Sequence, residues 1–339
     1  KKILILKNDR GGDLFASLKL ISSLMLDINE ITIYLSNLNF GFSFLFKNVV
    51  IKKINYNLSF FEKIIIFLDV FKNKYDKVFI LSPKTFYYFL PFFFRKTKFY
   101  AIVYDGKKRL RPNTFLRKYL FKFKVVSRNK INIKSYRDLQ IELLDTNSDI
   151  DHNFGNLNIP LINPNLKKLL PNDFLLFQFR SKFFQELSWG IREFNLIIKS
   201  ISKKYKYILF CSDIEKDSNT LYFNNYFENN YSFIDNNSFK KIIVSGNNNV
   251  FYLKDINSEN LFSIIKLAKK TLAKEGIISH ISYFHSVDCH NLFNFKINNI
   301  DDVIHQKISY SEWCTGMNFK FSFLNSDVRK AIKKIIKNI

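Results

Sequence analysis

Short apolar runs alternate with longer helical patterns along most of the chain, and this alternation is the feature that most constrains the fold. Residues 3–6 form a wholly apolar run, and the next segment carries Leu14, Leu18 and Ile21 at helical spacing. Apolar strands that alternate with helices are typical of parallel sheets covered on both faces. We therefore expect an α/β protein built from Rossmann-like domains.

The same pattern continues to the end of the chain. Further strands are expected at residues 31–35, 49–54, 78–81, 99–104, 174–179, 207–211, 250–253 and 271–274. Further helices are expected at residues 59–71, 84–94, 136–144, 191–201, 261–268 and 327–339.

The length of 339 residues predicts two domains, because a typical domain has roughly 150 residues. From about residue 146, Asn, Asp, Gly and Pro cluster, and these residues favour turns over a continuing helix or strand. We expect an N-terminal Rossmann-like domain at 1–146, a linker at 147–171, a second Rossmann-like domain at 172–324, and a C-terminal helix at 325–339. That helix could pack back on the first domain.

The formal net charge of +24 suggests an anionic partner. Nucleic acid, an anionic membrane and phosphorylated sugars would all fit. The abundance of Lys, Asn, Ile, Phe and Tyr is also what AT-rich codons specify, so the charge permits an anionic partner without identifying one. No aromatic and basic motif typical of nucleic-acid binding is present, and we expect no nucleic acid. Basic candidates for binding an acceptor, or for a solvated surface, are Lys107, Lys108, Arg109, Arg111 and Arg117.

Cysteine usage favours a reducing compartment. Cys211, Cys289 and Cys314 are an odd number with wide spacing, which predicts neither a disulfide framework nor a Cys-based metal site. Cys289 stands beside Asp288 and His290, a group that we interpret as a buried small residue next to a polar turn. We expect no metal and a cytoplasmic location.

The longest apolar stretch, residues 86–94, is too short to span a bilayer, which takes roughly 20 residues. Arg95, Lys96 and Lys98 follow it directly. We expect a buried helix of the first domain, and the alternative is a helix that lies on a membrane surface with its basic end on anionic head groups.

The first candidate site is the junction at residues 7–14, where a strand leads into a helix. Gly11 and Gly12 suggest a tight turn, and helix-initial amides attract negative charge. Asp13 is either a functional carboxylate or an acid that caps the helix. Because the pattern is not GxGxxG, a dinucleotide-dependent oxidoreductase is not supported.

The second candidate site is the junction at residues 271–281. Glu275 stands at a strand end, where a carboxylate can accept hydrogen bonds from sugar hydroxyls. The amides from Gly276 through Ile277 to Ser279 open a helix and could hold a diphosphate. His280 follows one turn later and is either a ligand of the same pocket or an ordinary core residue.

Both junctions resemble those of the ADP-heptose:lipopolysaccharide heptosyltransferases, glycosyltransferase family 9. That family opens with a strand, an Arg/Asp-rich turn ending in Gly-Asp, and a helix, and residues 7–18 are similar. It also carries a late Asp-(Ser/Thr)-Gly-x-x-His turn, which residues 275–280 resemble with the same separation of acid and His. The layout between the motifs, including Trp189 before a helix, is similar too.

The chain departs from the family pattern at several positions. Glu275 replaces the usual Asp, and Gly276 comes one position earlier than the glycine of the family. Leu187 and Ser188 stand close to where the family places a phosphate-binding Lys. Arg180 and Lys182 are the nearest substitutes for it.

The resemblance implies a GT-B fold, two Rossmann-like domains that face across a cleft, and inverting, metal-independent glycosyl transfer. Asp13 would be the catalytic base, and Arg10, Gly11 and Gly12 would lie at the acceptor. The second domain would bind a nucleotide-sugar donor, ADP-linked in the family, with no other cofactor. Residues expected at the donor are Arg180, Lys182, Glu275, Gly276, Ile277, Ser279 and His280.

The implied acceptor is an anionic saccharide or glycolipid, as in lipopolysaccharide or surface-glycan synthesis. Such an acceptor implies work at the inner face of the cytoplasmic membrane, with peripheral membrane association as a further expectation. The alternative from another class is a catalytically silent protein of the same fold that binds anionic glycan or nucleic acid through its basic surface.

Overall fold

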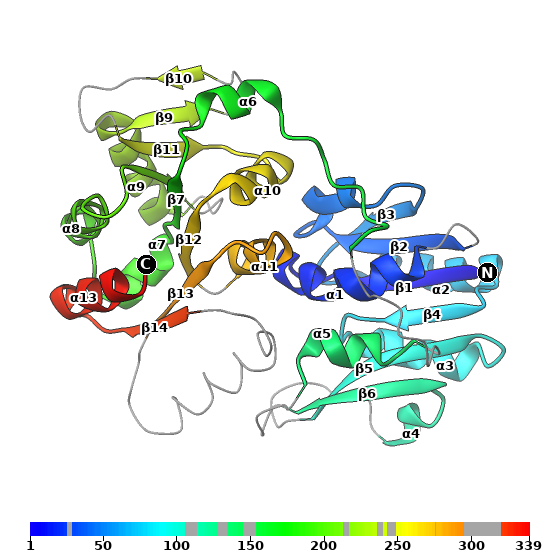
Figure 1. Cartoon of the computed structure of the whole chain (residues 1–339). Coiled ribbons are helices and arrows are strands. Elements are labelled where there is room, and N and C mark those ends of the chain that lie inside the picture. Colours follow the sequence, from blue (N-terminus) through cyan, green and yellow to red (C-terminus); the bar gives the residue numbers. More distant parts are fainter. Residues whose placement is uncertain are drawn as a thin grey trace. The chain divides into compact units, whose positions relative to one another are not determined.

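The structure is a computed structural model that describes residues 1–25, 29–105, 114–127, 134–144, 154–212, 217–235, 240–242, 249–274, 276–294 and 320–339 (Figure 1). These residues form two compact units. Unit 1 comprises the described residues up to Ile159, and unit 2 comprises those from Pro160 on. This boundary falls inside the expected linker, where Pro160, Pro164 and Pro171 stand.

Unit 1 is a parallel six-stranded sheet with the strand order β3-β2-β1-β4-β5-β6 (Figure 1). This is the order of a doubly wound Rossmann sheet, in which the direction of winding reverses between the first and fourth strands. Its strands are β1 (Lys2–Lys7), β2 (Glu30–Ser36), β3 (Val50–Ile54), β4 (Lys77–Ile80), β5 (Lys98–Asp105) and β6 (Lys122–Ser127). Its helices are α1 (Gly11–Leu24), η1 (Phe40–Leu45), α2 (Phe60–Asn73), η2 (Thr85–Phe89), α3 (Leu90–Phe93), α4 (Thr114–Arg117) and α5 (Tyr136–Ile141).

The two faces of this sheet are covered by different helices. Leu4 and Leu6 of β1 pack in one cluster with Ile66 and Val70 of α2, and the buried parts of η2, α3 and α4 belong to the same cluster. On the other side α1 and α5 lie against each other. Alternate residues of a strand point to opposite faces, so the wholly apolar β1 contributes to both layers.

Unit 2 is an eight-stranded sheet with the order β10-β9-β11-β8-β7-β12-β13-β14, parallel except for the β9 and β10 pair. Its strands are β7 (Phe174–Gln178), β8 (Tyr207–Cys211), β9 (Ser232–Asp235), β10 (Lys240–Ile242), β11 (Val250–Lys254), β12 (Lys270–Lys274), β13 (Cys289–Asn294) and β14 (Lys320–Leu324). Its helices are α6 (Pro164–Leu169), α7 (Ser181–Glu186), α8 (Ile191–Ile201), α9 (Ser218–Asn230), α10 (Ser258–Leu267), α11 (Ile277–Phe284) and α13 (Val328–Asn338).

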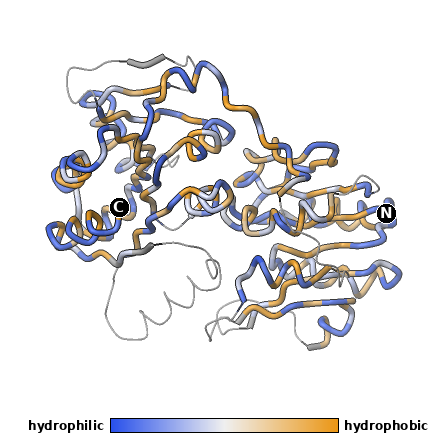
Figure 2. The backbone as a smooth tube through the Cα atoms, viewed as in Figure 1, coloured by the Kyte–Doolittle hydropathy of each residue, from blue (hydrophilic) through white to orange (hydrophobic). Residues whose placement is uncertain are grey.

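The core of unit 2 is rich in phenylalanine. The ring of Phe194 lies 4.7 Å from that of Phe227 and 5.2 Å from that of Phe210. Such pairs connect α8, α9 and β8, three elements that are separated in the sequence. Figure 2 shows hydrophobic segments alternating with hydrophilic ones along the chain, as the sequence pattern predicts.

The C-terminal helix, which we allowed to pack back on the first domain, belongs to unit 2. There α13 packs against α8 and β14. Ile335 is buried in the same core cluster as Ile201, and Trp189 Nε1 donates a hydrogen bond to the Ser326 carbonyl oxygen at 3.0 Å. The apolar face of this helix is therefore used inside unit 2.

Two local predictions were wrong in detail. Gly11 and Gly12 do not form a turn before the helix, because α1 already begins at Gly11. The turn is made by the preceding residues up to Arg10, which has an extended backbone. The stretch at 84–94 is not one buried helix but a 3-10 helix followed by one short α-turn, and Phe89, Phe92 and Phe93 are exposed.

Among the described residues, no helix is both long enough and apolar enough to cross a membrane.

Candidate functional site

In unit 1 the carboxyl ends of β1 and β4 mark the point where the sheet reverses its winding, which is where ligands bind in open α/β sheets. Lys7 ends β1 at this point, Asn8 and Asp9 follow it, and all three polar residues are buried. Lys7 Nζ donates to Asp9 Oδ2 at 2.8 Å and to the Leu81 carbonyl oxygen at 3.3 Å. A buried ion pair thus lies where β1 ends and the loop into α1 begins.

Hydrogen bonds from β2, from the residue before η1 and from η2 hold this loop. Asn39 Nδ2 donates to the Lys7 carbonyl oxygen at 2.9 Å, and the Ser36 hydroxyl donates to the Asp9 carbonyl oxygen at 2.5 Å. The Tyr87 hydroxyl donates to Asn8 Oδ1 at 2.9 Å. Two backbone carbonyls and one side chain of residues 7–9, which precede α1, are therefore held by hydrogen bonds.

Asp9 has an unusual environment for a carboxylate. Burial, with a smaller contribution from the negative charge of Asp13, raises its pKa to about 6 against the opposing effect of Lys7. Its Oδ1 atom makes no hydrogen bond of ordinary geometry with any described residue. Strongly perturbed carboxylates of this kind gather at functional sites more often than elsewhere.

Asp13 is the third residue of α1 and half-buried. Its Oδ2 atom accepts a long hydrogen bond, 3.4 Å, from the Arg10 backbone amide. This contact is the capping role that we weighed for Asp13 from the sequence, and it leaves the other carboxylate oxygen for a further contact. Arg10 is exposed, Gly11 is buried and Gly12 is half-buried.

In unit 2 the winding reverses between β7 and β12, so their carboxyl ends are the corresponding position. Arg180 follows β7, and Gly276 precedes α11 shortly after β12. The Arg180 Nη1 atom lies 3.9 Å from the position that a Cβ at Gly276 would occupy. The structure therefore brings together a guanidinium and the first turn of α11, two predicted donor residues almost a hundred positions apart.

The first turn of α11 presents backbone amides rather than side chains. Gly276 offers no capping side chain, and the amides of Ile277 and Ser279 fall in the turn whose N–H groups lack intrahelical partners. The Ser279 hydroxyl donates instead to Asn291 Oδ1 in the core. An anion at this helix start would be bound by amides and by Arg180.

The remaining predicted donor residues differ from one another. His280 is buried in α11, only 7% exposed, which fits the core interpretation that we left open. Lys182 is exposed on α7. Glu275 lies outside the described residues, as do Lys107, Lys108, Arg109 and Arg111 of the basic segment, whereas Arg117 is described on α4.

Two groups at these strand ends were missed from the sequence. One is the Lys7 and Asp9 pair, whose signal is a charged residue that directly follows an apolar strand. The other is Lys274 at the end of β12, whose Nζ lies 3.8 Å from Glu186 Oε2. Asn294 Nδ2 donates to the same oxygen at 3.0 Å, so Glu186 connects the ends of β12 and β13.

The structure groups no three or more His, Cys, Asp or Glu residues in a way that could hold a metal, within the part of the chain that it describes. Cys211 and Cys289 are buried there and form no disulfide, and burial raises the pKa of Cys289. Cys289 thus behaves as the small buried residue that we expected.

Comparison with solved structures identifies the fold. The chain is similar to the crystal structure of a glycosyl transferase family 9 protein from Veillonella parvula, with a TM-score of 0.63 and 12% identity over 100% of this chain and 90% of that one. It is also similar to E. coli ADP-heptose LPS heptosyltransferase II, with a TM-score of 0.61 and 11% identity over 99% and 97% of the two chains. The fold is GT-B.

The chain is also similar in structure to proteins outside glycosyltransferase family 9. UDP-GlcNAc 2-epimerase from Methanocaldococcus jannaschii gives a TM-score of 0.56 at 13% identity over 99% of this chain and 92% of that one. At sequence identities of 11–13%, these similarities show a shared fold. No protein-family model and no curated protein sequence matches the chain. The resemblance to the heptosyltransferases that the two motifs indicate is confirmed at the level of the GT-B fold.

Proposed function

We propose that this protein is an inverting, metal-independent glycosyltransferase that moves a sugar from a nucleoside-diphosphate donor to a saccharide or glycolipid acceptor. The observation that carries the proposal is the placement of Arg180 beside the first turn of α11, at the winding reversal of unit 2. A cation and free helix amides at that point form a site for a diphosphate. One neighbour of the same fold, E. coli heptosyltransferase WaaC, was solved with ADP and with ADP-2-deoxy-2-fluoro heptose.

In this proposal Asp13 is the general base. It stands at the equivalent point of unit 1, with one carboxylate oxygen on the Arg10 amide. Asp13 would take the proton of the acceptor hydroxyl as that oxygen attacks C1 of the donor sugar, and the bond from C1 to the diphosphate would break. General bases contribute on the order of 10²–10⁴-fold to such steps.

Arg180, with Lys182 on the next helix, would neutralise the charge that develops on the leaving diphosphate. This is the role that a metal ion has in other transferases. Lys274 lies near the same strand ends but is held toward Glu186. We therefore assign the diphosphate to Arg180 and the α11 amides, with an ADP-linked donor and an anionic acceptor as the specific expectations.

Calorimetric titration tests the proposal. Purified protein is titrated with ADP, UDP and GDP and with sugars linked to each, in buffer with EDTA. Saturable binding of one nucleotide class that Arg180→Ala weakens and Asp13→Asn preserves supports the proposal. Binding of no nucleotide, together with tight salt-sensitive binding of anionic glycan or nucleic acid, would favour the silent binding protein instead.

A further inference from the structure

Helix α2 is apolar on the side that faces away from its own core. Ile66 and Val70 are its buried residues, and they pack against the sheet of unit 1. Spacings of three, four and seven residues place a second set of large apolar side chains on one solvent-facing stripe. Their exposed fractions are 71% for Phe60, 76% for Phe61, 40% for Ile64, 55% for Ile65, 55% for Leu68 and 66% for Phe71.

The stripe continues onto neighbouring helices that cover the same face of the sheet. The ring of Phe67 in α2 lies 5.5 Å from that of Phe93, and Phe92 lies 5.2 Å from Phe93 and 6.1 Å from Phe115 of α4. Phe92, Phe93 and Phe115 are 37%, 58% and 50% exposed. The exposed apolar side chains of α2, η2, α3 and α4 form one surface, which we call the aromatic face.

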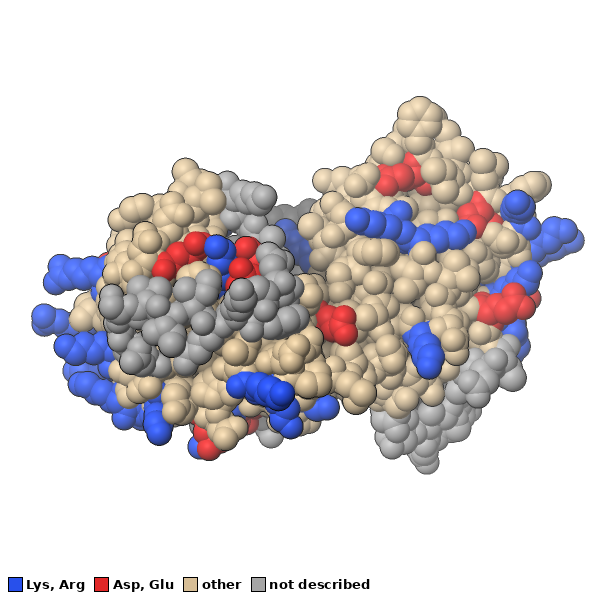
Figure 3. All heavy atoms as spheres, turned by 90° about the horizontal axis from the view of Figure 1, so that it is seen from above, with Lys and Arg blue, Asp and Glu red and all other residues tan. Residues whose placement is uncertain are grey.

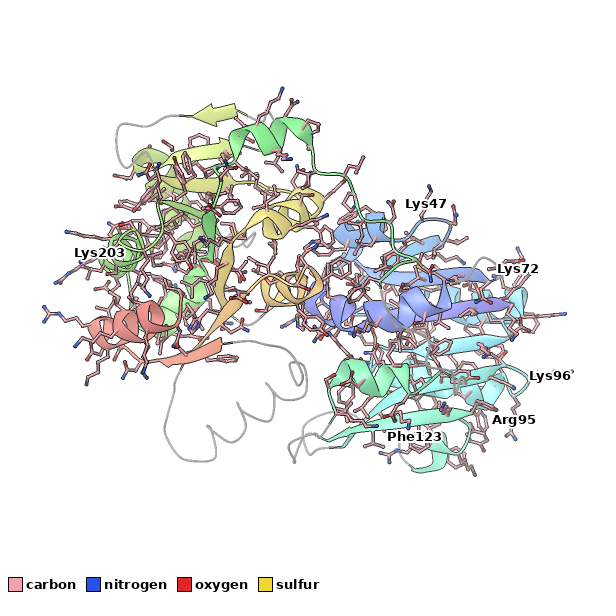
Figure 4. All side chains as sticks on the ribbon, in the orientation of Figure 1. Lys47, Lys72, Arg95, Lys96, Phe123 and Lys203 are labelled. Atoms are coloured by element: carbon pink, nitrogen blue, oxygen red, sulfur yellow. The ribbon has the colours of Figure 1, made fainter. Side chains whose placement is uncertain are left out.

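Cations lie directly on this surface. The Arg95 guanidinium is 4.8 Å from the centre of the Tyr119 ring, and Lys118 Nζ is 4.4 Å from the centre of the Phe115 ring. Lys72 and Lys96 are also exposed here, and Figure 4 shows Lys72, Arg95 and Lys96 projecting outward from unit 1. Long cationic side chains can keep their stems on apolar surface while the charged ends reach polar surroundings.

The acids of the same helices do not balance these cations, because both are engaged elsewhere. Glu62 accepts hydrogen bonds from the Asn55 and Ser59 amides. Asp69 accepts from the Tyr34 and Tyr75 hydroxyls and pairs with Lys52. On the face seen in Figure 3, Lys and Arg side chains are spread over both units, with Asp and Glu between them. The aromatic face therefore combines exposed apolar area with unbalanced positive charge.

We propose that the aromatic face docks unit 1 on an anionic phospholipid bilayer. Apolar and aromatic side chains would enter the boundary between head groups and acyl chains, and the cations would contact anionic head groups. A second copy fits less well, because an isologous contact would bring the Arg95 and Lys118 cations of both copies into one interface. The proposal does not depend on the reaction, but it would place the protein where a glycolipid acceptor is found.

Vesicle flotation of the full chain tests the docking. Phosphatidylcholine vesicles with phosphatidylglycerol are compared with phosphatidylcholine alone. We expect binding to the anionic vesicles that weakens with salt and is lost in Phe61→Gln/Leu68→Gln/Phe71→Gln. The matched control, Leu161→Gln/Leu221→Gln/Tyr222→Gln, removes three exposed apolar side chains of unit 2 and should bind like the unmodified protein.

The charge contribution is tested separately. Arg95→Gln/Lys118→Gln should weaken vesicle binding by about fivefold for each cation removed. The control Lys203→Gln/Lys206→Gln removes two exposed cations of unit 2 and should leave binding unchanged. Circular dichroism shows whether each variant is folded, and nucleotide titration shows that loss of docking is separate from loss of donor binding.

Two outcomes would overturn the docking proposal. One is undiminished vesicle binding by the folded α2 variant. The other is a dimer in analytical ultracentrifugation that the α2 variant converts to a monomer, without vesicle binding by either protein. The second outcome would make the aromatic face a contact between copies.

Discussion

The Lys7 ammonium and the Asp9 carboxylate lie 2.8 Å apart at the end of β1, and both side chains are buried. The pair occupies the winding reversal of unit 1, at the start of the loop that leads to Asp13. Each charge is tolerated there because the other compensates for lost hydration. Changes at either residue should therefore affect both stability and the site.

Removing one partner of this pair should be more harmful than removing both. We expect Lys7→Met to lower the free energy of unfolding by about 3–5 kcal/mol, because it leaves a buried carboxylate near Asp13. Lys7→Met/Asp9→Leu should recover much of that loss. Urea unfolding followed by circular dichroism measures both, with the exposed Lys182→Met as control. A double variant no more stable than Lys7→Met would contradict this account.

The raised pKa of Asp9 predicts a pH dependence of stability. Its pKa is about 6 in the folded protein, compared with a reference value of 3.8. Between these values the folded state binds more protons than the unfolded state, so this contribution to stability is complete below about pH 4. It is lost as the pH rises through about 6, by up to roughly 3 kcal/mol. Asp9→Asn should lack this component, and urea unfolding at several pH values would show whether the two profiles differ.

Asp13→Asn should separate the proposed chemistry from the capping contact. The amide oxygen of Asn can still accept the Arg10 backbone N–H, so we expect the melting temperature to stay close to that of the unmodified protein. Loss of the general base should lower kcat by on the order of 10²–10⁴-fold while the Kd for the donor nucleotide is retained. Once a donor is identified, steady-state kinetics measure kcat and calorimetry measures the Kd for the donor nucleotide. Unchanged kcat would remove Asp13 from the mechanism.

Arg180→Ala should weaken nucleotide-diphosphate binding by about ten- to a hundredfold, because a charge-assisted contact contributes about 1.5–3 kcal/mol. The corresponding nucleoside, which lacks phosphates, should bind both proteins equally. Lys203→Ala, an exposed cation on unit 2, is the control for general loss of charge. Equal weakening for nucleoside and diphosphate would point to a structural effect of Arg180.

The C-terminal helix should be required for the stability of unit 2. Ile335→Ala removes a side chain that is 1% exposed and should lower the free energy of unfolding by about 2–5 kcal/mol. Lys333→Ala, on the exposed side of α13, should change it little. Hydrogen exchange should show the loss of protection in α8 and β14, which contact α13. Loss confined to unit 1 would contradict the packing.

Much of the fold was predictable because helices and strands have different local patterns of apolar residues. The helix at 191–201 and the strand at 207–211 match α8 and β8. They were recognisable because buried residues recur at a different spacing in a helix than in a strand. The strands β6 and β10 were missed, as were β9, β13 and β14. Their short runs at 232–235, 289–294 and 320–324 contain several polar residues, and only pairing in the sheet of unit 2 makes them strands.

The sequence alone placed Asp13, Arg180 and Gly276 at strand-to-helix junctions, because short apolar runs and longer helical patterns alternate along the chain. The order of strands in each sheet came only from the tertiary structure. That order brings Arg180 to Gly276, and it buries Lys7 against Asp9 at the winding reversal. It also turns one apolar stripe of α2 to the core and leaves the other on the surface, because a helix with two apolar sides can bury only one against a single sheet.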